Sequence, residues 1–421
     1  AAPCSVSAAE KTTLTFWHAM GGTNGEVLQQ IVDDFNASQD EIEIKAEYQG
    51  TYDDTITKLK AAMQSDSGLP DVCQMYDVGT KFMYDSGAVI PVEDKFESTG
   101  YDKSSVMEVI SSYYTVDGKQ YAMPFNVSTP MLYYNKDVFE AAGLDPETPP
   151  TTYDEVLEDA KKIVESGAAP VGYSQAIYGW FFEQQLAGLG VTYGNNDNGR
   201  KEAVTAVDFD SNGGGLKVFD MWKKLYDSGY FEDYGTTTAD TQTAFFSGQV
   251  GMIIESTAIL KNAVDSSPFE VGTGYLPRIE QNDEGGVIIG GGSLWLTDTG
   301  NEANEDAAWK FIEYITTPDV QAKWSMGTGY FAINEKAYET EDMKAYLKEN
   351  PNFETAINQL KDSPVNCNTA GVLSGVQTEA RLTFNEIMPQ VYDGKLTTQD
   401  AVDQLAASVN KAIENYNESI K

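Results

Sequence analysis

The sequence predicts an α/β protein with two lobes. Strand-like and helix-like segments alternate over the first 76 residues, a pattern typical of a parallel sheet with right-handed crossovers. The chain has 421 residues, more than one hydrophobic core usually holds. We therefore expect at least one parallel sheet in the first lobe and a second domain after it.

The first strand and helix are predicted at the N-terminal end. Residues 12–17 are β-prone, and Thr23 and Glu26 have the spacing of a capping box that begins a helix. The apolar residues of this helix recur every three or four positions, as they do on a helix packed against a sheet. They are Val27, Leu28, Ile31, Val32 and Phe35.

Two more strands complete the alternation. Residues 41–48 alternate with period two, residues 52–65 form a helical pattern, and residues 70–76 form a third strand. Ligands of such sheets bind at the carboxyl ends of the strands. Residues 150–275 are predicted to be mostly helical, and a helix capped by Thr397 ends the chain.

The stretch around Pro124 and Pro130 is the most informative. The two prolines exclude a helix or a central strand between them, and the β-prone residues 131–134 follow directly. A polar segment that leads into a buried strand suits a chain crossing between two lobes, with Asn126 and Ser128 presented to a cleft. The alternative is an ordinary loop between two elements.

The charge of the chain excludes two classes of partner. Its net charge is −37, from 65 acidic and 28 basic residues. Nucleic acid and anionic lipid both require clustered lysine and arginine, so neither is an expected partner. An anionic small molecule stays compatible with this charge, because distant charges are screened and a local arginine can bind it.

Catalytic and metal-binding patterns are absent from the sequence. His18 is the only histidine, which excludes histidine triads and histidine zinc motifs. Residues 208–213 resemble the start of a calcium loop, but its twelfth position is Phe219, where a glutamate is required. Cys4, Cys73 and Cys367 lack metal-ligand spacing. We expect a protein that is not an enzyme and needs no cofactor or metal.

Seven segments of the chain, in order, resemble the extracellular solute-binding proteins of ABC importers, and in particular their glycerol-3-phosphate-binding members. They are residues 16–20, 48–52, 74–80, 124–130, 288–295, 327–330 and 371–381. The resemblance implies the type II periplasmic-binding-protein fold, in which two α/β lobes joined by a hinge close over a small-molecule ligand in the cleft between them. It also implies an ABC permease as the membrane partner.

The resemblance suggests a division of the chain into lobes. We expect residues 1–125 and 288–330 in the N-terminal lobe, and residues 126–287 and 331–421 in the C-terminal lobe. We also expect a monomer in the periplasm or at the cell surface. No signal peptide is present, so the chain is either cytosolic or already processed. Cys4 is a candidate site for a lipid anchor.

The resemblance also implies ligand-binding residues. Tyr52 and Asp77 match positions at the glycerol end of the ligand. The positions around the phosphate are matched by Ser128, Ser256 or Thr257, Gly290 or Gly291, Tyr330 and Arg381. This set suits a phosphate, which favours a planar guanidinium, hydroxyl donors and exposed backbone N–H groups. Alternatively, Arg381 forms an ion pair between the lobes and the glycines mark a hinge or bulge.

One departure from the family pattern bears on the ligand. Of two tryptophans in the glycerol-3-phosphate binders, this chain keeps Trp180 and has Ile177 in place of the other. The smaller side chain opens space beside the phosphate, which suits a glycerophosphodiester such as glycerophosphocholine. A diester also carries less charge than a monoester. The alternative ligand is a di- or oligosaccharide bound through aromatic faces and carboxylates.

Overall fold

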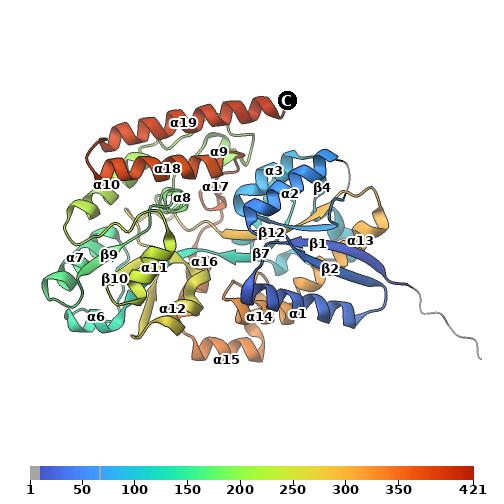
Figure 1. Ribbon diagram of the computed structural model, residues 1–421, viewed down its shortest axis with the longest axis horizontal. Helices are drawn as coiled ribbons and strands as arrows, with labels where there is room; N and C mark the ends of the chain where they lie inside the picture. The colour runs from blue at the N-terminus through green and yellow to red at the C-terminus, as the bar shows by residue number, and fades with distance from the viewer. Residues whose placement is uncertain (1–9, 66–67) are drawn as a thin grey trace, which may run out of the picture.

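The computed structural model describes residues 10–65 and 68–421 of the chain. Cys4, and with it the predicted lipid anchor, lies outside the described residues. Two lobes lie side by side, and each is built around its own β-sheet (Figure 1). In the part of the chain that is described, no helix has both the length and the apolar composition of a membrane span.

The first sheet carries the N-terminal strands. Its order is β2-β1-β3-β12-β4, and β7 also pairs with β12. The strands β1, β2 and β3 run parallel, as the sequence predicts, whereas β12 is antiparallel to β3, so the sheet is mixed. The strands are β1 (Thr12–His18), β2 (Ile42–Tyr48), β3 (Val72–Tyr76), β4 (Val89–Ile90), β7 (Met123–Ser128) and β12 (Gly290–Thr297).

The helix after β1 packs against the sheet as predicted, but it begins differently. Leu28, Ile31, Val32 and Phe35 of this helix are buried. The predicted capping box is wrong, because the helix begins at Gly22 after Gly21, with no side-chain cap. The helices of this lobe are α1 (Gly22–Ser38), α2 (Tyr52–Ser65), α3 (Thr80–Asp85), α4 (Glu93–Thr99), α5 (Glu108–Ser111), α13 (Glu302–Ile315) and α14 (Pro318–Thr328); α15 (Glu341–Glu349) packs on α14.

The second sheet has the order β11-β8-β10-β9. Three of its strands lie in residues 150–275, which the sequence predicts as mostly helical, so that prediction missed β9, β10 and β11. The strands are β8 (Pro130–Asn135), β9 (Val171–Ser174), β10 (Val250–Ser256) and β11 (Val271–Gly274). They are short and fully buried, and alternating polarity is therefore absent.

Helices pack around the second sheet (Figure 1). Thr397 accepts a hydrogen bond from Asp400 N and caps the last helix, as predicted. The helices are α6 (Lys136–Ala141), α7 (Tyr153–Glu165), α8 (Gly179–Gly188), α9 (Asn195–Gly199), α10 (Gly214–Asp227), α11 (Thr238–Phe246), α12 (Leu260–Ser266), α16 (Asn352–Asp362), α17 (Cys367–Ala370), α18 (Gln377–Tyr392) and α19 (Thr398–Ser419).

The chain passes between the sheets at the segment bracketed by the two prolines. β7 pairs with the first sheet, β8 pairs with the second, and Thr129 alone separates them. Pro124 is tolerated near the start of β7, whose other edge is bridged only further along, at Val127, and Pro130 because it begins β8. A second passage runs from the end of β11 to Gly290, the first residue of β12.

Candidate ligand site between the lobes

Several predicted site residues of the first lobe meet at the end of its sheet. Asn126 Nδ2 donates to the hydroxyl of Tyr52 at 2.6 Å, and its Oδ1 accepts from Gln74 Nε2 at 2.8 Å. The Tyr52 ring stacks on Tyr76, with centroids 5.2 Å apart. Burial raises the pKa of Tyr330, and interactions with Asn126 and Tyr52 oppose that rise. Tyr52 and Tyr330 therefore belong to one hydroxyl cluster around Asn126.

Arg381 connects this end of the sheet with the second lobe. Its Nε lies 2.6 Å from Glu183 Oε2 and its Nη2 lies 3.2 Å from Glu183 Oε1, so helix α18 holds helix α8 through a two-point ion pair. Nη2 also lies 3.4 Å from Oδ2 of Asp77, which directly follows β3. Burial opposes the charge of Arg381, yet the two carboxylates outweigh it and raise its pKa well above the ordinary value. Arg381 thus forms the ion pair between the lobes that the sequence left as an alternative.

The ion pairs do not use every donor of the guanidinium. Within the described residues, no hydrogen bond is seen from Nη1 of Arg381, so its two N–H groups remain available. Two carboxylates share this one cation, so the cluster without ligand carries excess negative charge. Such a site accommodates a neutral ligand or a monoanion at lower electrostatic cost than a dianion.

A second group of predicted residues meets beside Gly290. A Cβ placed on Gly290 would lie 2.8 Å from Cζ2 of the Trp180 ring and 3.6 Å from Oγ of Ser128. The Trp180 indole nitrogen is buried and has no hydrogen-bond partner within the described residues. A buried N–H without a partner costs free energy, so this donor is suited to a ligand acceptor.

The remaining predicted residues occupy different positions. Gly291 has φ +95°, and a Cβ there would collide with the carbonyl oxygen of Asn126, so it permits the irregular pairing of β12 with β7. Thr257 Oγ1 accepts from Thr129 N and fixes the passage between lobes, while Ser256 Oγ accepts from Ala258 N. Ile177 is buried in the core of the second lobe, three residues before Trp180.

Glu183 is the functional candidate that the sequence interpretation missed. It is the one acidic residue of α8, on a helix whose other residues are apolar or neutral and which is buried throughout. A buried carboxylate requires a cation partner, and that requirement could have pointed to Arg381. Tyr178 lies near the same charges: burial raises its pKa to about 12, with Arg381 opposing that rise and Asp77 adding to it.

Glu255, at the end of β10, supports a prediction on pH. Its carboxylate accepts from Gln242 Nε2 at 3.0 Å and from Ser256 N at 2.7 Å, and burial raises its pKa from 4.5 to about 6. The raised pKa stabilises the fold below pH 4.5, and this contribution is lost as the pH rises through about 6. At pH 7 the free energy of unfolding of Glu255→Gln is therefore expected to exceed that of the wild type by about 2 kcal/mol. The variant should then unfold at a higher urea concentration. At pH 4 the two proteins should match, and an equal difference at both pH values would contradict the assignment.

Comparison with known proteins gives the class of this protein. The family model described as bacterial extracellular solute-binding protein matches residues 30–355. The chain belongs to this family, whose members bind solutes for transport and work with ABC permeases. The two-lobed fold and the residues gathered between the lobes agree with that class.

Individual relatives are named for two different kinds of ligand. The chain is 31% identical to the sn-glycerol-3-phosphate-binding periplasmic protein UgpB of Escherichia coli (strain K12), over 97% of this chain and 94% of that protein. A cyclic α-maltosyl-1,6-maltose-binding protein from Arthrobacter globiformis superposes with a TM-score of 0.80 at 26% identity, covering 96% and 100% of the two chains. UgpB from Mycobacterium tuberculosis, solved in complex with glycerophosphocholine, also gives 0.80, at 20% identity and 97% and 99% coverage. Because the identity to the Mycobacterium tuberculosis protein is 20%, that similarity shows the fold alone.

Proposed function

We propose that this solute-binding protein captures a glycerophosphodiester in the cleft between its lobes and delivers it to an ABC permease. The observation that carries the proposal is the pairing of Arg381 with both Glu183 and Asp77. Three charges are held in one buried cluster, so a ligand with a single negative charge suits it better than a phosphate monoester. Nη1 of Arg381, Ser128 Oγ and Trp180 Nε1 supply donors for the phosphodiester oxygens.

The glycerol part of the proposed ligand would contact polar groups. The hydroxyls of Tyr52 and Tyr330 and the carboxylate of Asp77 offer partners for the glycerol hydroxyls. The aromatic faces of Tyr178 and Trp180, whose centroids are 6.0 Å apart, suit a cationic substituent such as choline.

Titration calorimetry with glycerophosphocholine, glycerol 3-phosphate and maltose tests the proposal. We expect glycerophosphocholine to bind most tightly. Preference for glycerol 3-phosphate would overturn the charge argument but keep the phosphate site. Binding of maltose alone would overturn the phosphate assignment and leave the transport role.

An oligosaccharide is the second candidate, and one observation favours it. The carboxylates of Asp77 and Glu183 and the buried aromatic rings near them are groups that bind sugar hydroxyls and stack on sugar rings. The likeness to the maltosyl-maltose-binding protein points the same way. The maltose titration distinguishes the two candidates.

The indole nitrogen of Trp180 gives a sharper test of the phosphodiester site. Trp180→Phe keeps an aromatic ring and removes the unpartnered N–H, so affinity for glycerophosphocholine is expected to fall by about 1–1.5 kcal/mol. Trp222→Phe is the matched control, because Trp222 Nε1 is also buried without a partner but belongs to the core of the second lobe. Equal effects of the two substitutions on calorimetric affinity would contradict a ligand contact at Trp180.

Three further expectations stay predictions. They are the lipid anchor at Cys4, the monomeric state, and the exclusion of nucleic acid as a partner. The division into residues 1–125 with 288–330 and residues 126–287 with 331–421 also stays a prediction. Limited proteolysis followed by mass spectrometry of the fragments would test that division.

A further inference from the structure

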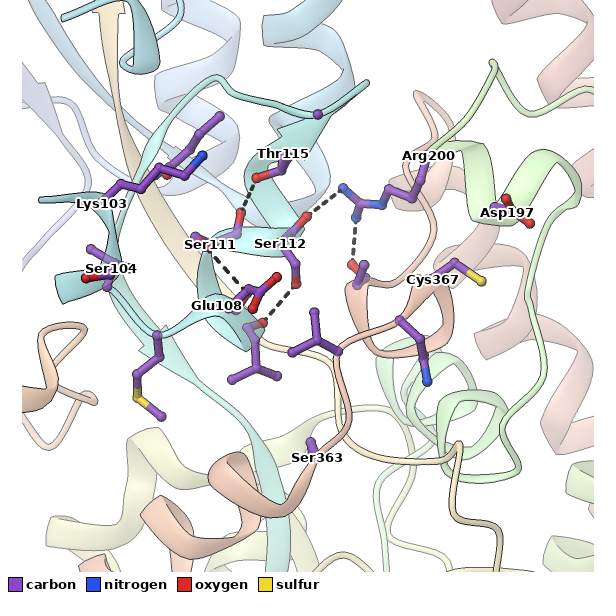
Figure 2. A pocket seen from close by; sticks show the side chains of 18 of the residues that line it. Lys103, Ser104, Glu108, Ser111, Ser112, Thr115, Asp197, Arg200, Ser363 and Cys367 are labelled. Carbon is purple, nitrogen blue, oxygen red and sulfur yellow. Dashed lines mark hydrogen bonds between the residues drawn. The ribbon is translucent and has the colours of Figure 1, made fainter. Parts of the chain in front are cut away.

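Arg200 is a partly buried cation whose hydrogen bonds, among the described residues, all go to main-chain carbonyl groups. Its Nη1 lies 2.6 Å from Tyr113 O, its Nη2 lies 2.6 Å from Ala370 O, and its Nε lies 2.9 Å from Gly371 O. Among the described residues, no carboxylate pairs with it, and burial lowers its pKa to about 10. Figure 2 shows the guanidinium at the edge of a cavity of about 1130 Å³, reaching from the loop after α9 towards Ser112. Carbonyl dipoles therefore replace the missing counter-ion.

The carbonyl groups that Arg200 contacts come from two different lobes. Tyr113 belongs to the core cluster of the first lobe, next to α5, whereas Ala370 and Gly371 end helix α17. Gly371 also lies against the second passage between the sheets, because a Cβ there would lie 2.8 Å from Cγ2 of Ile288. Arg200 thus joins the two lobes beside a segment that must bend when they move.

The backbone before Arg200 is strained. Asn196, Asp197, Asn198 and Gly199 have φ values of 56°, 54°, 60° and 75°, a run of four left-handed residues, a conformation that residues other than glycine normally adopt only singly. Asn198 holds this turn, since its Oδ1 accepts from Tyr193 N and its Nδ2 donates to Cys367 O. Strain that surrounding contacts maintain is typical of functional positions.

Tyr113 connects Arg200 with the candidate ligand site. The guanidinium lies over the Tyr113 ring, 5.1 Å from its centroid, and the Tyr113 hydroxyl donates to Asp77 O at 3.1 Å. The carboxylate of Asp77 in turn reaches Arg381. A displacement of Tyr113 would therefore move Asp77, which faces the ligand.

We propose that Arg200 is a tie between the lobes that favours their closed arrangement and, through Tyr113, positions Asp77 for the ligand. It is a positioning residue and touches no ligand itself. The proposal deepens the proposed function, since its affinity measurement uses glycerophosphocholine. Its effect on the arrangement of the lobes is independent of which ligand binds.

Small-angle X-ray scattering of the protein without ligand is the first test. Arg200→Lys keeps the charge but replaces a planar fork, whose three nitrogens each bond a different carbonyl group, by a single ammonium nitrogen, so we expect a larger radius of gyration than in the wild type. Lys223→Met is the control, because Lys223 donates to Tyr392 O and pairs with Asp227 within the second lobe alone. A radius of gyration for Arg200→Lys equal to that of the control would overturn the proposal.

Calorimetry of a double-mutant cycle is the second test. Arg200→Lys is expected to weaken glycerophosphocholine binding roughly 5–150-fold, the usual range of coupling between sites. Tyr113→Phe removes the bond to Asp77 O, and the double variant should lose less affinity than the sum of the single losses. Additive losses would overturn the role of Tyr113. Absence of binding by the wild type would contradict the proposed function, while the scattering result would still decide whether Arg200 ties the lobes.

Discussion

Arg381→Met is expected to lower the free energy of unfolding by roughly 3–5 kcal/mol and to abolish measurable binding of glycerophosphocholine. The substitution keeps an unbranched apolar stem and removes the cation, so Glu183, which is buried on α8, loses its partner at 2.6 Å. An unpaired buried carboxylate is strongly destabilising. Urea unfolding at pH 7 measures the first effect and calorimetry the second.

A double variant separates stability from binding. Arg381→Met with Glu183→Gln removes both members of the ion pair, and we expect most of the lost stability to return, because replacing a whole buried pair is often close to neutral. Binding should stay absent, since the Nη1 donors are still missing. Recovered binding in the double variant would show that Arg381 serves the fold and not the ligand. A loss of less than about 1 kcal/mol in the single variant would mean that the ion pair is exposed to solvent.

The fold could be predicted well where hydrophobic periodicity was strong. The parallel strands β1, β2 and β3 and the helix α2 lie where the sequence predicts them, since their patterns repeat over many residues. The strands β9 and β11 were missed because four buried residues carry no alternation. The start of α1 was predicted at a capping box, but Gly21 precedes it and no side chain caps it.

For the candidate site, the sequence offers residue types by family resemblance, but it does not give their pairing with one another. Family resemblance named Tyr52, Asp77 and Arg381, and the structure brings Asp77 and Arg381 to within 3.4 Å. It could not show that Glu183 would hold the guanidinium, because the two residues are 198 positions apart and no short motif joins them. Long-range pairing of this kind depends on how α8 and α18 pack, which periodicity alone does not specify.

Gly291→Ala is expected to destabilise the protein by at least about 3 kcal/mol, the second large effect. Gly291 has φ +95°, a backbone conformation that residues with a side chain rarely adopt. An added Cβ would also collide with Asn126 O. Backbone atoms cannot rotate away as a side chain can, so β7 would have to separate from β12. Asn126 would then move, and its hydrogen bond to Tyr52 would be lost.

Gly300→Ala is the control that separates strain from collision. Gly300 also has a positive φ, +71°, but no atom lies within 4 Å of an added Cβ. It should cost only the conformational strain, about 1–2 kcal/mol. The difference between the two variants in free energy of unfolding, measured with urea, then gives the cost of the collision at Gly291. Equal losses of stability would show that β7 moves away from the added Cβ at no cost. Because the same collision displaces Asn126, Gly291→Ala should also weaken ligand binding in the fraction that folds, whereas Gly300→Ala should leave it unchanged.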